Sequence, residues 1–175
     1  MQELFILKSD VRTPIGDMTA CATNDGICLL EFNERPDLKK QITSLLNQLK
    51  GKIVPGNNTH LLNLQLQLDQ YFNEEITNFD LPLVFACTEF QKKVWDALLK
   101  IPYGHRDTYL SLTKRLGDEK AIRAVAAASG ANKMAILVPC HRVIGSNRKL
   151  VGYAGGLWRK QWLLDHESKQ SSFDF

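Results

Sequence analysis

The chain has 175 residues, of which 44% are hydrophobic and 23% charged, a composition typical of soluble globular proteins and long enough for one domain or two small ones. It contains no apolar run long enough to span a bilayer, and residues 1–6 lack the pattern of a secretory signal. We therefore expect a cytoplasmic protein of two domains that has no membrane as a partner.

The net charge of +3 is unevenly distributed along the chain. Residues 1–88 carry 7 Lys or Arg and 11 Asp or Glu, a net charge of −4, whereas residues 89–175 carry 15 and 8, a net charge of +7. A basic half joined to a mildly acidic one suits binding to a phosphate backbone. From charge alone, a solvated basic face without a partner is an equally good interpretation.

The first half of the chain predicts a small α/β domain over residues 1–85. Strands are expected at 4–7, 18–22, 27–32 and 79–83, and helices at 37–49 and 61–72, from apolar spacing. Asn24-Asp25-Gly26 is a strong hairpin signal between the second and third strands. Gly51 follows the first helix and marks its end.

The second half predicts a mainly helical domain over residues 86–167, followed by a tail at 168–175. Thr88 is a good N-cap for a helix at 89–100. Gly117 ends a short helix at 110–116, and Asp118 can cap the next helix, at 119–129. Two helices joined by a glycine-containing turn have the form of a helix-turn-helix.

The second helix of this pair, residues 119–129, is rich in alanine. It offers almost none of the side chains that read base edges in the major groove, and Arg123 is its single long projection near the middle. A thin alanine surface suits close approach to the backbone or the minor groove, and hence sequence-tolerant binding. Helix propensity and tight packing also favour alanine, and the two interpretations fit opposite faces of one helix.

Four cysteines, Cys21, Cys28, Cys87 and Cys140, lack the CxxC spacing of zinc sites, and a reducing compartment disfavours disulfides. Cys21, Cys28 and Cys87 lie among apolar or β-prone neighbours, so we expect them to be small core residues. No metal site is expected.

Cys140 stands in a different setting. The apolar run 135–138 predicts a buried strand or extended segment that delivers Cys140 to a pocket. A thiol is a nucleophile only as the thiolate, which needs a nearby base or positive charge, and His141 and Arg142 follow directly. Glu167 on the last helix could orient the histidine as the third member of a relay. A cysteine followed by a histidine, taken alone, nevertheless favours a structural role for Cys140 over a catalytic one.

A wider set of motifs accompanies this cysteine. With these motifs the chain resembles the O6-alkylguanine-DNA alkyltransferases, and the match covers nearly all of residues 89–167. The matching stretches are Phe90-Gln91 to Val94-Trp95, Ile101-Pro102-Tyr103-Gly104 with Thr108-Tyr109, Ala121-Ile122-Arg123-Ala124-Val125, Asn132, residues 136–145 around Pro139-Cys140-His141-Arg142, Gly152-Tyr153-Ala154-Gly155-Gly156-Leu157, and Lys160 to Glu167. The N-terminal half is compatible with the variable α/β domain of that family.

The resemblance implies DNA repair by a methylated-DNA–protein-cysteine S-methyltransferase that acts once, without metal or cofactor. Cys140 takes the alkyl group, His141 acts as its base through a water, and Glu167 orients His141. Tyr109 binds the flipped guanine and delivers a proton to it, a task suited to a phenol in a dry pocket. Arg123 fills the gap left in the duplex, because a stacked base cannot present O6 to a buried thiol.

The resemblance also implies the remaining contacts. DNA binding is expected from Lys120, Arg123, Ala124, Ala127 and Tyr109, and the guanine pocket from Asn132, Met134, Val143, Tyr153 and Ala154, with Asn132 bracing the turns around the site. The implied partner of this expected monomer is double-stranded DNA containing O6-alkylguanine, with O4-alkylthymine as a second candidate lesion. Lys133 follows Asn132 where the family usually has proline, which bears on the width of the pocket.

Two other functions fit parts of the sequence. One is a non-catalytic helix-turn-helix protein that binds damaged DNA or regulates transcription. The other is a cysteine hydrolase with an acyl intermediate at Cys140, although the sequence has no particular signature of the oxyanion hole that a hydrolase needs.

Overall fold

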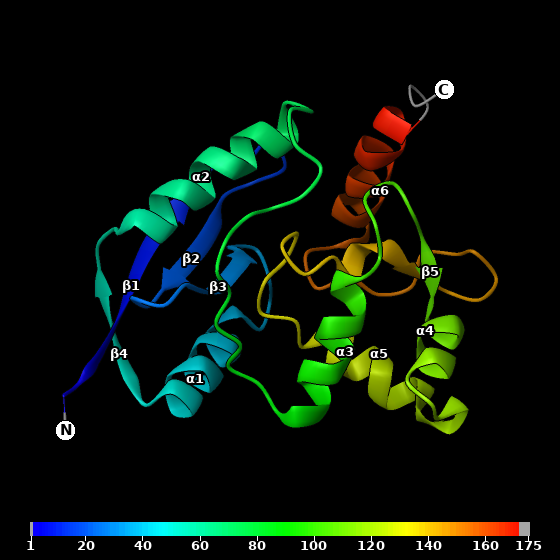
Figure 1. The fold of residues 1–175 in the computed structure, drawn as a ribbon, viewed down its shortest axis with the longest axis horizontal. Helices are drawn as coiled ribbons and strands as arrows, with labels where there is room; N and C mark the ends of the chain where they lie inside the picture. The colour runs from blue at the N-terminus through cyan, green and yellow to red at the C-terminus, as the bar shows by residue number, and fades with distance from the viewer. Residues whose placement is uncertain (1, 172–175) are drawn as a thin grey trace. The chain divides into compact units, whose positions relative to one another are not determined.

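The computed structural model describes residues 2–171 and divides into two compact units, Met1–Cys87 and Thr88–Phe175. The N-terminal unit is an α/β unit and the C-terminal unit is mainly helical (Figure 1). None of the helices within residues 2–171 is long and apolar enough to cross a membrane.

The N-terminal unit is built on a sheet with strand order β3-β2-β1-β4. β1 (Leu4–Val11), β2 (Met18–Ala22) and β3 (Ile27–Phe32) form an antiparallel meander, and β4 (Gly51–Pro55) pairs in parallel with β1. The predicted hairpin between β2 and β3 is confirmed, and its turn closes with a 2.9 Å bond from the Thr23 amide to the Gly26 carbonyl. Gly26 is required there, because a Cβ would lie 2.4 Å from the Pro82 carbonyl oxygen.

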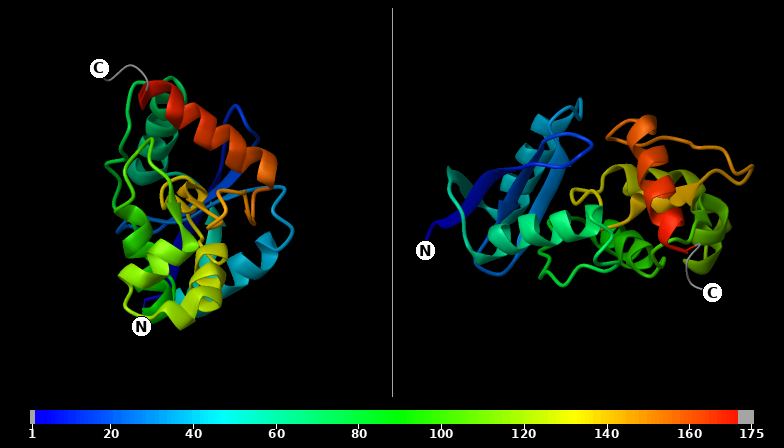
Figure 2. Two further views of the ribbon diagram at one scale, coloured as in Figure 1. Left: turned by 90° about the vertical axis from the view of Figure 1, so that its right-hand side faces the viewer. Right: turned by 90° about the horizontal axis from the view of Figure 1, so that it is seen from above.

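Two helices cover this sheet. Every residue of β2 and β3 is buried, so both faces of these two strands are covered (Figure 2). Leu45 of α1 (Leu38–Leu49) packs with Ile6 and Cys21 on one face, and α2 (Thr59–Phe72) contacts β2. Arg35 lies just before α1 and is buried between carboxylates, 2.7 Å from Glu31 and 2.5 Å from Asp37.

The predicted strand at 79–83 is wrong, and β4 was not predicted. Around residue 82 only a single bridge forms, in which the Ile27 amide donates to the Pro82 carbonyl, because proline has no amide to continue a ladder. β4 begins at Gly51 and ends at Pro55, so residues typical of turns obscured a strand that pairing with β1 creates.

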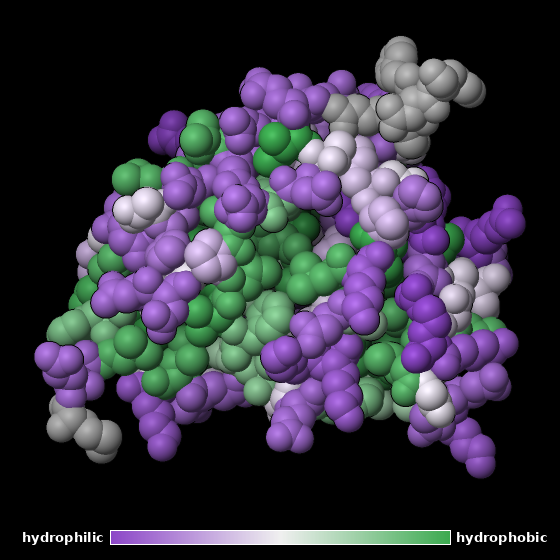
Figure 3. All heavy atoms as spheres, viewed as in Figure 1, coloured by the Kyte–Doolittle hydropathy of each residue, from purple (hydrophilic) through white to green (hydrophobic). Residues whose placement is uncertain are grey.

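The C-terminal unit begins with α3 (Glu89–Leu99), and the predicted Thr88 cap is confirmed as a full capping box with Gln91. After it come β5 (Asp107–Thr108), α4 (Tyr109–Arg115), the 3-10 turn η1 (Glu119–Ala121), α5 (Ile122–Gly130), the 3-10 turn η2 (Cys140–Arg142), β6 (Val143–Ile144) and α6 (Leu157–Ser171). α4 packs against η1 and α5, as a helix-turn-helix requires. Hydrophilic side chains cover much of the α3 and α4 side in Figure 3.

Three predicted elements differ in this unit. The helix expected at 119–129 is split into η1, capped by Asp118, and α5. Residues 135–138 are buried as expected but form turns rather than a strand, with Ile136 at a φ of 72°. α6 continues to Ser171, so the first part of the tail expected at 168–175 is helical, and residues 172–175 lie outside the described residues.

Candidate active site

Cys140 begins the 3-10 turn η2 directly after Pro139 and is partly exposed. Short backbone bonds fold the preceding segment: the Val138 amide donates to the Met134 carbonyl at 2.9 Å, and the Cys140 amide donates to the Val138 carbonyl at 2.8 Å. The turn therefore presents the thiol at the end of a buried, tightly folded segment. The other cysteines differ: burial raises the pKa of Cys21 and of Cys28 to about 12, and Cys87, expected in the core, is only half-buried.

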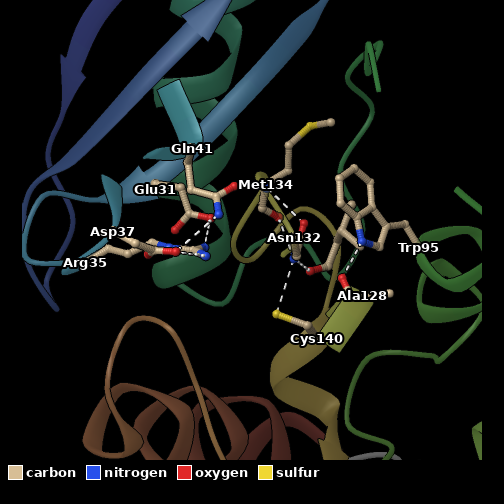
Figure 4. Close-up of polar contacts among 10 residues, drawn as sticks. Glu31, Arg35, Asp37, Gln41, Trp95, Ala128, Asn132, Met134 and Cys140 are labelled. Atoms are coloured by element: carbon tan, nitrogen blue, oxygen red, sulfur yellow. Dashed lines mark hydrogen bonds and ion pairs between the residues drawn. The ribbon is translucent and has the colours of Figure 1, made fainter. Parts of the chain in front are cut away.

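Asn132 holds this turn together from inside (Figure 4). Its buried side-chain amide nitrogen lies 2.8 Å from the Val138 carbonyl oxygen and 3.2 Å from the sulfur of Cys140, while its oxygen accepts from the Met134 amide at 2.9 Å. An N–H group that faces sulfur favours a negative charge there. One side chain thus fixes the backbone around Cys140 and contacts its sulfur, which fits the bracing role expected from the sequence.

Asn132→Ala is expected to lower the free energy of unfolding by about 2–4 kcal/mol, because the buried Met134 amide loses its acceptor and the Val138 carbonyl keeps only the Cys140 amide as a donor. Urea denaturation measures this loss. Asn147→Ala is the matched control: its side chain also accepts from a backbone amide, that of Lys149, but is exposed, and a loss below about 1 kcal/mol is expected. Equal losses in both variants would contradict the bracing role.

His141, Arg142 and Glu167 form a buried network behind Cys140. One carboxylate oxygen of Glu167 lies 2.8 Å from His141 Nε2 and 2.9 Å from Arg142 Nη2, and the other accepts from Arg142 Nε at 2.9 Å. Arg142 also donates to the Ile101 carbonyl at 2.7 Å. The fork of Arg142 therefore locks the carboxylate that orients His141. Arg142 was named from the sequence only as a nearby positive charge, and nothing in the residue pattern showed that it would grip Glu167.

The charges of this network follow from burial and pairing. Burial lowers the pKa of His141, against the opposing influence of Glu167. Burial alone would raise the pKa of Glu167, but His141 and Arg142 hold it well below its usual range. A neutral His141 beside an ionised Glu167 must carry its proton on Nε2, which leaves Nδ1 as a base. Nδ1 has no hydrogen-bond partner within the part of the chain that the structure describes.

A two-stranded pairing brings Tyr109 to the same region. β5 pairs in parallel with β6, with Asp107 opposite Val143 and Thr108 opposite Ile144. Because Tyr109 follows Thr108 and Val143 follows η2, this pairing aligns the start of α4 with the cysteine turn. Burial and the charge of Cys140 raise the pKa of Tyr109 to about 12, so the phenol keeps its proton at neutral pH.

The expected pocket residues divide into a rigid and a loop part. Met134 and Val143 are fully buried, whereas Tyr153 and Ala154 are half-buried in the loop between β6 and α6. Lys160 of α6 is buried and donates to the carbonyls of Val151 and Gly152, at 3.0 and 3.2 Å. Lys160 belonged to a matching motif, but sequence reasoning gave it no role.

The faces of α5 separate as the alanine pattern suggested. Val125, Ala128 and Ser129 are buried, and Trp95 of α3 donates to the Ala128 carbonyl at 2.8 Å (Figure 4). Four of the expected DNA contacts are exposed, namely Arg123, Ala124 and Ala127 of α5 and Lys120 of η1. Alanine therefore serves packing on one side and leaves a thin surface on the other, from which Arg123 projects.

Within residues 2–171 no three His, Cys, Asp or Glu side chains come together in a way that could hold a metal ion. The groups that the described residues contribute to the site are a partly exposed thiol, a neutral histidine, the carboxylate that orients it, a phenol and a buried lysine.

Two family matches together cover most of the chain. Residues 89–169 match the family described as 6-O-methylguanine DNA methyltransferase, DNA binding domain, and residues 6–85 match 6-O-methylguanine DNA methyltransferase, ribonuclease-like domain. A methylated-DNA–protein-cysteine methyltransferase of Methanosarcina barkeri is 38% identical over 157 residues, which cover 90% of this chain and 94% of the relative. This chain belongs to the 6-O-methylguanine DNA methyltransferase family. The resemblance drawn from the sequence is thereby confirmed.

Other members of the 6-O-methylguanine DNA methyltransferase family match in different ways. A methylated-DNA–protein-cysteine methyltransferase of Methanosarcina acetivorans is 54% identical over 101 residues, 58% of this chain, and the match spans 65% of that relative. The crystal structure of Mycobacterium tuberculosis O6-methylguanine methyltransferase superposes with a TM-score of 0.79 at 35% identity, covering 97% of this chain and 99% of that one. The same organism's OGT in complex with DNA gives 0.78 at 36%, covering 95% and 94%. The predicted fold class is confirmed.

Proposed function

We propose that this protein repairs DNA by transferring the methyl group of O6-methylguanine to Cys140, in one reaction per molecule. The observation that carries the proposal is the partly exposed Cys140 sulfur, contacted by Asn132 and followed by His141, which Glu167 orients. A solved structure of a family member in complex with DNA, 36% identical to this chain, supports DNA as the partner.

The reaction balances with the groups of the site. The thiol proton of Cys140 passes to Nδ1 of His141 through a water, and the sulfur attacks the methyl carbon. The carbon–oxygen bond breaks, its electron pair stays on O6, and the leaving guanine takes up a proton with Tyr109 as donor. The sulfur ends as a thioether, which is not readily reversed, so the protein is spent.

Access to O6 requires that the guanine leave the duplex, because a stacked base cannot reach a thiol in a pocket. The exposed Arg123 projects from the alanine surface of α5 and takes the place of the flipped base. The half-buried Tyr153 and Ala154 form the loop side of the pocket, and Val143 and Met134 form its rigid side. Monomeric state, cytoplasmic location and independence of cofactors belong to the same proposal.

The test is to incubate the protein with duplex DNA that carries one O6-methylguanine with a labelled methyl group. We expect one methyl group per protein molecule, located on the peptide that contains Cys140, and unmodified guanine in the DNA. Cys140→Ala should accept none, while Cys87→Ala, which removes the other partly exposed thiol, should accept as much as the unchanged protein.

Two outcomes would replace the proposal. Tight binding to the damaged duplex without any transfer would favour the non-catalytic helix-turn-helix function. Turnover of ester or amide substrates through an acyl intermediate on Cys140 would favour a hydrolase.

A further inference from the structure

His141 and Arg142, the two basic residues that follow Cys140, are already committed to other interactions. Arg142 is bound by both oxygens of Glu167, which neutralises its charge. His141 is kept neutral by burial, which lowers its pKa. A thiolate at Cys140 therefore obtains little stabilisation from the two residues that follow it in sequence.

Lys160 is bound differently. Its ammonium is buried and donates to two neutral acceptors, the Val151 and Gly152 carbonyls, at 3.0 and 3.2 Å. Among the ion pairs of the described residues none joins Lys160 to a carboxylate. Carbonyl oxygens hold an ammonium in place without cancelling its charge, so its field remains available to neighbouring groups.

Lys160 lies close to Tyr109 and is coupled electrostatically to Cys140, and both residues take part in the proposed reaction. Its nitrogen lies 5.8 Å from the centre of the Tyr109 ring, and its charge and that of Cys140 influence each other. Burial lowers the pKa of Lys160 to about 8, and a negative Cys140 opposes that decrease. At neutral pH the side chain is therefore still mainly an ammonium.

We propose that Lys160 is a positioning residue for the alkyl transfer, whose ammonium, fixed by the Val151 and Gly152 carbonyls, stabilises Cys140 as the thiolate. The inference rests on the proposed function, because it assigns a role within that reaction. The charges of Tyr109 on α4 and His141 on η2 couple to the Cys140–Lys160 pair, and Arg142 on η2 and Glu167 on α6 act on His141 in turn. Among Lys160 and these four groups, Lys160 is the one that supplies a positive charge without a carboxylate partner.

The test measures the rate at which iodoacetamide alkylates Cys140 in the full chain as a function of pH, read on the Cys140 peptide by mass spectrometry. Lys160→Met removes the charge and both hydrogen bonds, and Lys160→Gln removes the charge but keeps a donor for the loop carbonyls. Both profiles are expected to move to higher pH by about one unit, because one nearby charge has an effect of this size. Lys160→Arg, which keeps the charge, should stay closer to the unchanged protein.

Controls separate charge from folding. Lys169→Met removes an exposed lysine from the same helix and should leave the profile unchanged. Cys87 in each protein serves as an internal reference thiol, and thermal unfolding verifies that each variant is folded. An unshifted profile in folded Lys160→Met and Lys160→Gln would overturn the inference, as would a shift in Lys160→Met alone. The profile is measured without DNA, so failure of methyl transfer in the unchanged protein would overturn the proposed function separately.

Discussion

The Glu167→Ala variant is expected to unfold with a free energy about 3–5 kcal/mol below that of the unchanged protein. Glu167 is buried and accepts hydrogen bonds from Arg142, through Nε and Nη2, and from His141. Its removal leaves the buried Arg142 guanidinium with the Ile101 carbonyl as its one remaining acceptor among residues 2–171, and burying an uncompensated charge is costly. Urea denaturation followed by fluorescence measures the loss.

The same change should slow methyl transfer by about a hundredfold or more, because His141 loses the partner that fixes its proton on Nε2. Asp165→Ala is the matched control: it removes an exposed carboxylate of the same helix, whose partner is the Gln161 amide. Its effect on stability is expected to be below about 1 kcal/mol. If the Glu167→Ala variant were as stable as this control, the buried network of His141, Arg142 and Glu167 would contribute nothing to the free energy of unfolding.

The network also makes a prediction about acid. Its contacts hold the pKa of Glu167 below the value near 4.3 that is typical of an unfolded chain. The stabilisation from ionised Glu167 is therefore fully present above that unfolded value and is lost as the pH falls through the folded one. Glu167→Gln, which cannot ionise, should lose stability less steeply below about pH 5 than the unchanged protein, as measured by urea midpoints at several pH values.

Local signals in the sequence predicted local structure well. Thr88 and Asp118 indicated caps, and Asn24-Asp25-Gly26 indicated a hairpin, because each signal depends on residues within a few positions. β4 was missed because its structure depends on β1, more than forty residues away in the chain. The run before Cys140 was predicted as strand or extended because it is apolar, yet the side chain of Asn132 folds it into turns.

The candidate site shows the same division. A contact between His141 and Glu167 was expected, because their motifs resemble those of the alkyltransferase family. In the structure His141 Nε2 lies 2.8 Å from a carboxylate oxygen of Glu167. Arg142 and Lys160 belong to the same motifs, but their contacts were not predicted. Arg142 binds the Glu167 carboxylate and the Ile101 carbonyl, and Lys160 binds the Val151 carbonyl, and only the folded chain brings these groups together. Spacing in sequence carries no information on such contacts. The roles of all these residues remain predictions that the experiments above test.

Arg123→Ala is expected to slow repair of O6-methylguanine in duplex DNA by about a hundredfold, while the reaction with free O6-benzylguanine stays nearly unchanged. Extruding a base costs a few kcal/mol of stacking and pairing, and a side chain that fills the gap offsets part of that cost. A loss of about 2–3 kcal/mol corresponds to a rate decrease of roughly this size. Single-turnover rates on the two substrates measure the difference. Equal losses on both would contradict the gap-filling role, because the free base needs no flipping.

Lys120→Ala supplies the matched control for Arg123→Ala, since both side chains are exposed, that of Lys120 on η1 and that of Arg123 on α5. A residue that contacts phosphate weakens binding to all duplexes and reduces the salt dependence of affinity by about one charge. Its effect on repair should therefore disappear at saturating DNA, whereas the effect of Arg123→Ala should persist there. Ala124 and Ala127 are exposed as well, and their short side chains allow close approach to the duplex but add neither charge nor reach. If repair by the Lys120→Ala variant stays slow at saturating DNA, Lys120 contributes to base flipping as well as to binding, and the distinction between the two residues is contradicted.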